Sequence, residues 1–254
     1  MKKAITMMLG IFMALTSIIS FCRYGNGVML LSGECANASQ NIMINDEKPL
    51  VIKDIVNKEN KLEYKFRIHI PKITGLKDTK KQNAINEAIS KDIFRFRDDF
   101  IENAKGGDNS EAEVYYTVTN NKKIFSLIVY YYEYYGGAHG LTTKKSINIY
   151  VPNSGGINES QNFLTIGDLF LDKVDYKSLI NNYIISEIKK EPAKYFEDTV
   201  EKYTGFNENN FYFNDKGLVI YFQSYEIAPY ASGSPEFNIS YSFLRNYLKK
   251  DFIP

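Results

Sequence analysis

The chain has 254 residues, of which 44% are hydrophobic, enough to fill one large core or two small ones. Its 31 Lys plus Arg residues balance 30 Asp plus Glu residues, so no strong overall field would attract a polyanion. We therefore expect no nucleic-acid partner.

The first 38 residues resemble an export segment. Two lysines precede an uncharged, mostly apolar run over residues 4–21, as in a secretory signal peptide, and an A-x-A pattern ending at Ala38 offers a cleavage site. Cleavage normally falls closer to the apolar run, so an uncleaved membrane anchor over residues 4–21, or attachment to a lipid, is the alternative. Either way we expect an extracellular protein, secreted or tethered to the outer face of the membrane. Cys22 and Cys35 both precede the cleavage site, so the exported part has no disulfide.

Residues 39–155 are expected to form the first of two small domains. Residues 39–60 are interpreted as a polar tether that ends in a short strand, and residues 62–70 alternate as a half-buried strand that Pro71 ends. Asp78 is positioned to cap a helix that runs to about residue 105, and its apolar stripe should lie across a sheet. Three further strands are predicted at 114–119, 124–135 and 144–151.

Residues 156–254 are expected to form the second domain, after a boundary rich in Gly, Asn and Ser near residues 153–162. A helix begins at Asp175, and a second helical piece follows Pro192. The run "FYFNDKGLVIYF" predicts a hairpin in which Gly217 suits a left-handed conformation. A last strand near residue 238 and a short helix complete the chain. The fold class is therefore α+β, two small units each with a helix packed on an antiparallel sheet.

The residue pattern contains no recognisable catalytic centre. The exported part has only two histidines, His69 and His139, and no cysteine pair, so we expect no metal site and no cofactor. His69 lies on the polar side of its strand and should face solvent. No G-x-S-x-G motif is present, and we expect a protein that is not an enzyme. Glu133 and Glu226, both among tyrosines, keep open the alternative of a wall-glycan enzyme or an inhibitor of a wall hydrolase, with His139 as a third polar candidate.

Aromatic residues are the most informative feature, with 20 Tyr, 17 Phe and no Trp. In the stretch "YYYEYYGGAHG", Tyr130, Tyr132 and Tyr134 share one face of a strand, whereas Tyr131, Glu133 and Tyr135 share the other. One face should meet the helix. The other is either further core or an open aromatic surface suited to sugars or a protein partner.

The corner that follows this strand is the candidate binding site. Gly136 and Gly137 are expected to form the bend that ends the strand and to place His139 near Tyr134 or Tyr135. A second loop could come to the same end of the molecule. We therefore expect one composite ligand-binding edge, made of Tyr134, Tyr135, His139, Tyr225, Glu226 and Tyr230.

Residues 62–248 resemble the paired domains of unknown function that form the extracellular part of the RsiV anti-sigma factor and the N-terminal part of the PdaC peptidoglycan deacetylase. The resemblance rests on "YYGGAHG", "SINIYV", "LTIGDLF" and the run from "FYFNDKG" to "FLRNYL". It implies a cell-surface module that binds or senses wall glycan or a muramidase such as lysozyme. Only Met1–Lys3 precede the apolar run and nothing follows Pro254, so we expect neither a sigma-factor-binding segment nor a deacetylase domain.

Overall fold

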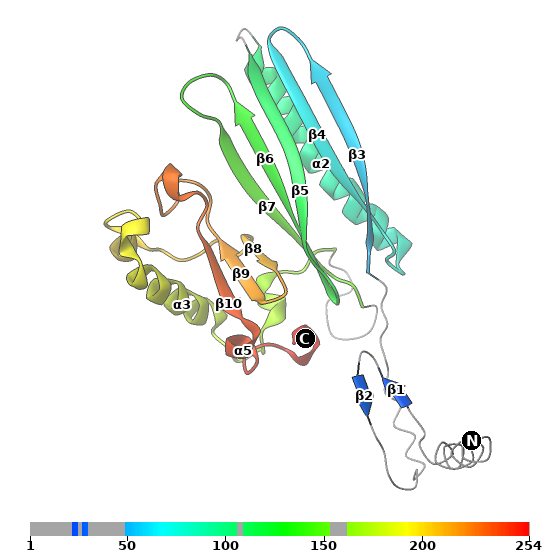
Figure 1. Ribbon diagram of the computed structural model, residues 1–254, viewed down its shortest axis with the longest axis vertical. Helices are drawn as coiled ribbons and strands as arrows, with labels where there is room; N and C mark the ends of the chain where they lie inside the picture. Colours follow the sequence, from blue (N-terminus) through cyan, green and yellow to red (C-terminus); the bar gives the residue numbers. More distant parts are fainter. Residues whose placement is uncertain (1–21, 25–26, 30–48, 106–108, 153–161, 254) are drawn as a thin grey trace, which may run out of the picture. The chain divides into compact units, whose positions relative to one another are not determined.

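The computed structural model describes residues 22–24, 27–29, 49–105, 109–152 and 162–253 (Figure 1). Residues 1–45 and 46–254 form two separate compact units. In the first, strands β1 (Cys22–Tyr24) and β2 (Gly27–Met29) pair antiparallel. The predicted apolar run and cleavage site, and the boundary segment 153–161, lie outside the described residues. None of the helices described is both long and apolar enough to cross a membrane.

The second unit contains a five-stranded sheet in the order β3-β4-β5-β6-β7. Its strands and the helix that connects β4 to β5 are β3 (Val51–Asn60), β4 (Tyr64–Thr74), α2 (Thr79–Ala104), β5 (Ser110–Asn121), β6 (Ile124–Tyr134) and β7 (Leu141–Tyr150). Neighbouring strands are antiparallel except β4 and β5, which are parallel because the chain crosses over through α2 between them. The expected α+β class is confirmed, with this one parallel pair as a difference.

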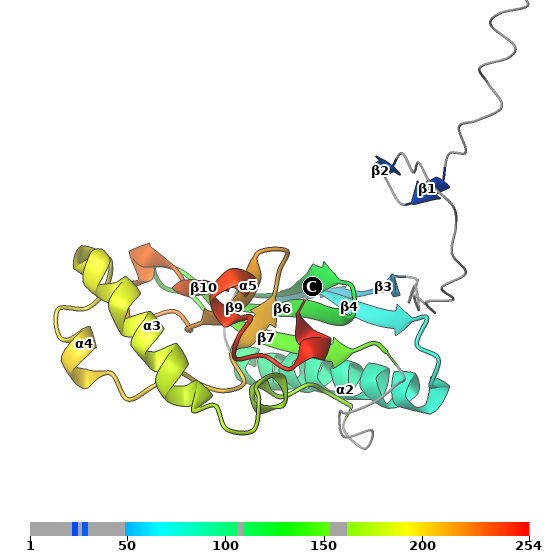
Figure 2. The same cartoon turned by 90° about the horizontal axis from the view of Figure 1, so that it is seen from below.

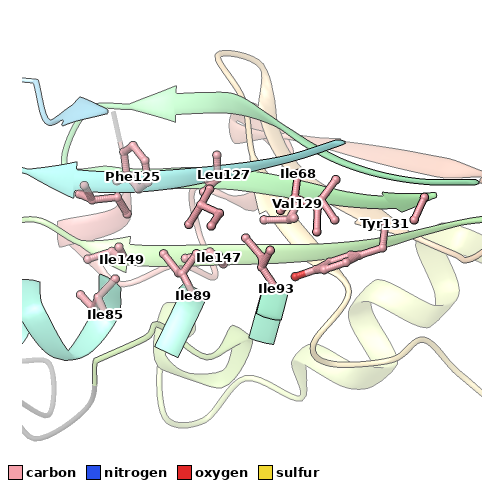
Figure 3. Packing of buried hydrophobic residues seen from close by; sticks show 14 of the residues in the cluster. Ile68, Ile85, Ile89, Ile93, Phe125, Leu127, Val129, Tyr131, Ile147 and Ile149 are labelled. Atoms are coloured by element: carbon pink, nitrogen blue, oxygen red, sulfur yellow. The ribbon is translucent and has the colours of Figure 1, made fainter. Parts of the chain in front are cut away.

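Helix α2 lies on one face of this sheet, as its apolar stripe predicts (Figure 2). The Asp78 carboxylate accepts hydrogen bonds from the backbone N–H groups of Lys80 and Lys81, which confirms the expected cap. Ile85, Ile89 and Ile93 point from α2 into the side chains of β6 and β7 (Figure 3). This helix side of the sheet forms one of two large hydrophobic clusters; the other lies around a helix and a three-stranded sheet in the C-terminal part of this unit.

Two expectations at the start of the sheet are wrong. The segment interpreted as a tether with a short terminal strand contains the ten-residue strand β3, whose polar residues face solvent because β3 is an edge strand. Pro71 does not end β4, which continues to Thr74. Strand β5 pairs only with Tyr64–Ile68, so at Pro71 strand β4 has a neighbouring strand on one side alone. Proline lacks a backbone N–H, and at such a position this removes at most one hydrogen bond between strands.

A three-stranded sheet in the order β10-β9-β8 forms the rest of this unit. Its elements are η1 (Ile166–Leu169), α3 (Tyr176–Lys190), η2 (Pro192–Lys194), α4 (Thr199–Lys202), β8 (Phe211–Phe213), β9 (Gly217–Tyr221), η3 (Tyr230–Ser232), β10 (Glu236–Ser240), α5 (Tyr241–Leu244) and η4 (Lys250–Phe252). The predicted hairpin and the Asp175 cap of α3 are confirmed. Gly217 is not left-handed; it is needed because a Cβ there would lie 2.1 Å from the Ile239 carbonyl oxygen.

Buried polar side chains join the two sheets where β6 and β7 meet β8. The Ser126 hydroxyl donates to the Asn148 side-chain oxygen at 2.6 Å and accepts from the Phe213 N–H at 3.1 Å. Asn148 in turn donates to the Phe211 carbonyl at 2.8 Å. Because these groups are buried and mutually satisfied, they fix the register between the sheets. The division into domains 39–155 and 156–254 stays a prediction.

Candidate functional site

The tyrosines of strand β6 lie in two different environments. Tyr131 faces α2, where its ring packs edge-on against Phe96 with centroids 5.1 Å apart, and its hydroxyl donates to the Asp92 carboxylate at 2.7 Å. Burial and this bond together raise the pKa of Tyr131 far above its usual range. Burial alone would raise the pKa of Asp92, but hydrogen bonds from Lys145 and Tyr131 outweigh it and lower that pKa.

The opposite face of β6 holds a second aromatic group that the helix does not cover. Tyr130 stacks on Tyr115 of β5 with ring centroids 4.7 Å apart, and both rings are partly exposed. The Lys144 ammonium lies 5.9 Å from the Tyr130 ring centroid and 2.6 Å from a Glu236 carboxylate oxygen. The expected alternation of the two faces is therefore confirmed.

Farther along this face, Tyr132 lines a shallow depression of about 550 Å³ over β3, β4 and β5. The other lining residues are mostly charged and carry both signs; they are Lys58, Glu59, Asn60, Lys65, Phe66, Arg67, Glu111, Ala112 and Glu113. The Tyr132 ring also covers Gly140, where a Cβ would lie 2.3 Å from a ring carbon. Tyr132 thus connects the depression to the corner after β6.

That corner is a glycine bend, as expected. Gly136 and Gly137 have φ angles of +99° and +100°, which glycine adopts without strain. The Tyr134 hydroxyl donates to the Gly137 carbonyl at 3.0 Å and holds the bend against the end of the strand. The bend leaves His139 exposed, whereas Gly140 is buried.

The second predicted loop comes to the same place, although it lies far away in the sequence. The His139 ring stacks on Tyr230 with centroids 3.9 Å apart and an interplanar angle of 16°. The Tyr225 hydroxyl lies 3.2 Å from His139 Nε2, and the Tyr230 hydroxyl donates to the Gly140 carbonyl at 3.2 Å. We call His139, Tyr225 and Tyr230 the aromatic corner. Its three side chains are a composite of two segments, as the sequence hypothesis required.

The hydrogen bonds of His139 define its neutral tautomer. Nδ1 lies 3.0 Å from the Gly140 carbonyl oxygen, which can only accept a hydrogen bond, so Nδ1 carries the proton. Nε2 then accepts from the Tyr225 hydroxyl. Tyr225 has a φ of +68°, an unusual backbone conformation for a residue with a side chain. Tyr225 is 48% exposed and Tyr230 40% exposed, so this strained turn holds aromatic surface in solvent.

The other predicted site residues lie near the aromatic corner but have different contacts. Glu226 accepts from the Gln223 backbone N–H at 2.7 Å and so stabilises the base of the loop. Tyr135 is turned to the helix side, with its ring centroid 5.5 Å from that of Phe100 and its hydroxyl donating to Glu133 at 3.1 Å. Burial, the largest cause, raises the pKa of Tyr135 to about 12. Of the expected set, His139, Tyr225 and Tyr230 are in mutual contact.

One residue that positions the site was missed from the sequence. The Gln223 side chain accepts from the Lys144 backbone N–H at 2.9 Å and donates to the Lys144 carbonyl at 2.8 Å, like an added strand residue beside β7. These bonds anchor the second loop to the sheet. A single glutamine before a loop could not have been predicted from sequence to bond the backbone of a residue 79 positions away.

The two histidines and the carboxylates do not gather into a metal centre in the described part of the chain. His69, expected to face solvent, is only partly exposed and lies 2.8 Å from an Asp54 carboxylate oxygen on the neighbouring strand. Glu133, His139 and Glu226, the polar candidates for catalysis, share no hydrogen bond among the described residues, and each has another partner.

Two family models match successive parts of the chain. One, described as deacetylase PdaC, matches residues 57–142, and the other, described as a protein of unknown function (DUF3298), matches residues 167–242. Over 126 residues the chain is 30% identical to the peptidoglycan-N-acetylmuramic acid deacetylase PdaC of Bacillus subtilis strain 168. This match covers 47% of this chain and 25% of the deacetylase. Over 229 residues it is 26% identical to the anti-sigma-V factor RsiV of the same strain, covering 86% of this chain and 77% of RsiV.

Two crystal structures have the same fold. A DUF3298 family member from Bacteroides fragilis superposes with a TM-score of 0.57 at 20% identity, covering 80% of this chain and 94% of the other. A DUF3298 family protein from Pseudomonas aeruginosa PAO1 superposes with a TM-score of 0.58 at 12% identity, covering 82% of this chain and 98% of the other. The predicted resemblance to the paired domains of RsiV and PdaC is therefore confirmed. The chain spans a quarter of the deacetylase and about three quarters of RsiV.

Proposed function

We propose that this chain is an exported, non-catalytic binding or sensing module of the bacterial cell surface, with wall glycan or a muramidase-like protein as its ligand. The similarity to RsiV over 86% of the chain supports an extracellular regulatory or binding module. The partial similarity to a peptidoglycan deacetylase supports a ligand in the cell wall. The apolar run over residues 4–21 supports export, with cleavage or as a tether.

The aromatic corner is the observation that carries this proposal. Its three rings come from two loops, stack on one another and remain exposed, although burial would stabilise them by roughly 1.5–3 kcal/mol each. Exposed aromatic rings held in a fixed arrangement lose little conformational entropy on binding. Such rings are enriched at the centres of protein interfaces, and they also pack on the apolar faces of sugars.

The polar groups around the aromatic corner suit recognition better than catalysis. Hydrolysis of a glycan would need two carboxyl groups held on either side of one bond. Glu226 is occupied at the base of its loop, and Glu133 is bonded to Tyr135 on the helix side of β6. The depression beside Tyr132, which carries charges of both signs, could extend the binding surface for a polar ligand.

The test is a pair of binding assays on the purified chain, one with insoluble cell-wall sacculi and one with immobilised lysozyme. We expect binding in at least one assay, and His139→Ala and Tyr230→Ala to weaken it by about 1 kcal/mol or more each. Phe243→Ala is the matched control, because Phe243 is also 40% exposed but lies on α5. Absence of binding to both ligands, or equal binding by all three variants, would contradict the proposal.

A further inference from the structure

The two edge strands of the five-stranded sheet, β3 and β7, differ in whether their outer backbone groups have hydrogen-bond partners. At β7 the outer backbone groups are occupied, because Gln223 pairs with both main-chain groups of Lys144 and the Tyr221 hydroxyl accepts from the Ser146 N–H at 3.0 Å. At β3 the only strand partner within residues 49–253 as described is β4. Among the described residues, the sheet therefore has one occupied edge, at β7, and one unpaired edge, at β3.

Strand β3 also exposes apolar side chains. None of its ten residues is buried, and Val51, Ile55 and Val56 are 57%, 47% and 51% exposed. Two charged residues, Lys53 and Asp54, precede the pair Ile55–Val56 along the strand, and two more, Lys58 and Glu59, follow it. Lysines on an edge strand commonly prevent pairing with other strands. Here both signs of charge are present, so their order along β3 decides whether a second strand would be repelled or attracted.

The charges are arranged in opposite order on the two sides of Val56. Two residues away, Asp54 on one side corresponds to Lys58 on the other. Three residues away, Lys53 corresponds to Glu59. A strand with this pattern is complementary to a second copy of itself laid antiparallel, with Val56 on the two-fold axis.

We propose that β3 pairs with β3 of a second copy of this chain, antiparallel and centred on Val56, to form a continuous sheet across a two-fold dimer. Directly opposed residues of an antiparallel pair lie on the same face, so each Lys58 meets the other copy's Asp54 on one face. Each Lys53 meets the other copy's Glu59 on the opposite face. The two-fold symmetry makes four opposite-charge pairs from these two, and the two Val56 side chains meet at the centre.

Neighbouring registers lack this match. A slip that opposes Ile55 with Val56 places Lys53 opposite Lys58, and a slip that opposes Val56 with Asn57 places Asp54 opposite Glu59. A parallel in-register pair would oppose every charge with itself. The existing partners of these side chains are solvent-accessible: Asp54 bonds His69, and Glu59 bonds Lys61 at 2.5 Å. Both carboxylates can therefore accept a further ion pair.

The dimer would leave the aromatic corner free. The corner follows β6 and contacts the loop beside β7, at the far side of the sheet order from β3. Each dimer would then present two copies of the corner. The pairing rests on β3 alone. Because Lys58 and Glu59 also line the depression beside Tyr132, pairing would cover part of the depression and leave the aromatic corner accessible.

A cysteine on the axis tests the register. In the full chain with Cys22→Ser and Cys35→Ser, Val56→Cys places two thiols in a directly opposed pair, at a Cα separation that a disulfide can span. We expect mild oxidation to give a covalent dimer. Val51→Cys is the matched control, since Val51 is as exposed but would lie about 33 Å from Val51 of the second copy. Equal cross-linking of both variants, or none of Val56→Cys, would overturn the proposal.

Charge reversal tests the pairing independently. We expect Lys53→Glu to raise the dimer dissociation constant, measured by sedimentation equilibrium of the full chain in density-matched detergent, by about tenfold or more. The double variant Lys53→Glu/Glu59→Lys restores complementarity and should recover most of the loss. Lys250→Glu makes the same charge change on η4, away from β3. If Lys53→Glu behaves like Lys250→Glu, or if the chain is monomeric at all concentrations, the proposed dimer does not exist.

Discussion

The two faces of β6 carry the same residue type and use it for different purposes. Tyr131 faces α2, is 7% exposed and bonds a carboxylate that is itself held by Lys145. On the other side, the strand leads through Tyr132 and Tyr134 to a bend that holds His139 in solvent beside Tyr225 and Tyr230. Period-two alternation therefore places Tyr131 in the core beneath α2 and directs Tyr130 and Tyr132 to the opposite face of the sheet.

We propose that residues beneath α2 serve stability and that the aromatic corner serves recognition. Side chains beneath α2 bury apolar area and satisfy buried polar groups, so their loss should lower the free energy of unfolding. The aromatic corner contributes little buried area, and the loss of its side chains should leave the fold in place.

The largest expected effect is on the helix side. Ile93 is fully buried between α2 and the sheet, and Ile93→Ala should lower the free energy of unfolding by about 2–5 kcal/mol. Leu62→Ala, at a residue 86% exposed, is the matched control and should cost less than about 0.5 kcal/mol. Denaturant titration measures both. Binding per folded molecule should be unchanged in both variants.

Loss of the Tyr131 hydroxyl should cost less. Tyr131→Phe keeps the ring against Phe96 but leaves the Asp92 carboxylate without one donor, and we expect a loss of about 1–3 kcal/mol in unfolding free energy at neutral pH. A variant as stable as the parent protein would show that Lys145 and Arg95, the other two donors to Asp92, are sufficient to satisfy it.

The same site predicts a pH dependence. Because the folded-state pKa of Asp92 is lowered, its stabilising contribution is complete above the ordinary carboxyl pKa and is lost as pH falls through the folded value. Unfolding free energy should therefore decline as pH falls from about 5 to about 2, and Asp92→Asn should decline less steeply. Parallel slopes for the two proteins would show that Asp92 is not the titrating group.

The packing of the corner on the sheet can be tested at Gly140. A Cβ at this residue would lie 2.3 Å from the Tyr132 ring, so Gly140→Ala should displace the ring, cost about 1–3 kcal/mol and weaken ligand binding. The double variant Gly140→Ala/Tyr132→Ala removes the clash, and its cost should be smaller than the sum of the single costs. Additive costs would mean that Gly140 acts independently of Tyr132.

The smallest expected effect is that of reductant. Both cysteines precede residue 46, so the second unit, which contains β6, has no thiol. The melting temperature of this unit should be the same with and without reductant in a thermal scan. A shift would reveal a covalent link that involves Cys22 or Cys35.

Local patterns were sufficient for most elements. The stripe from Ile85 to Phe100 and the Asp78 cap predicted α2 to within a residue or two, and the alternation in β6 predicted both of its faces. The strand expected at the end of residues 39–60 was predicted too short, because an edge strand needs few buried side chains and so leaves a weak hydrophobic pattern. The role of Gly217 was misjudged because the close approach of Ile239 is a tertiary contact.

The candidate site was predictable in its composition and only partly in its geometry. The glycines of the bend and the tyrosines of the second loop pointed to two exposed segments, and three of the six expected residues are in mutual contact. The side to which Tyr135 turns, and the bonds that hold Glu226, depend on Phe100 and Gln223. Neither partner is marked by local sequence.

The most direct test of the account compares Tyr230→Ala with Tyr131→Phe in the same preparations. Each variant is measured for melting temperature and for affinity toward whichever ligand the parent protein binds, sacculi or lysozyme. We expect Tyr230→Ala to lose about 1 kcal/mol or more of binding energy with a nearly unchanged melting temperature. For Tyr131→Phe we expect a lowered melting temperature and unchanged affinity. Full affinity in Tyr230→Ala together with a lowered melting temperature would contradict the assignment of the aromatic corner as a binding site.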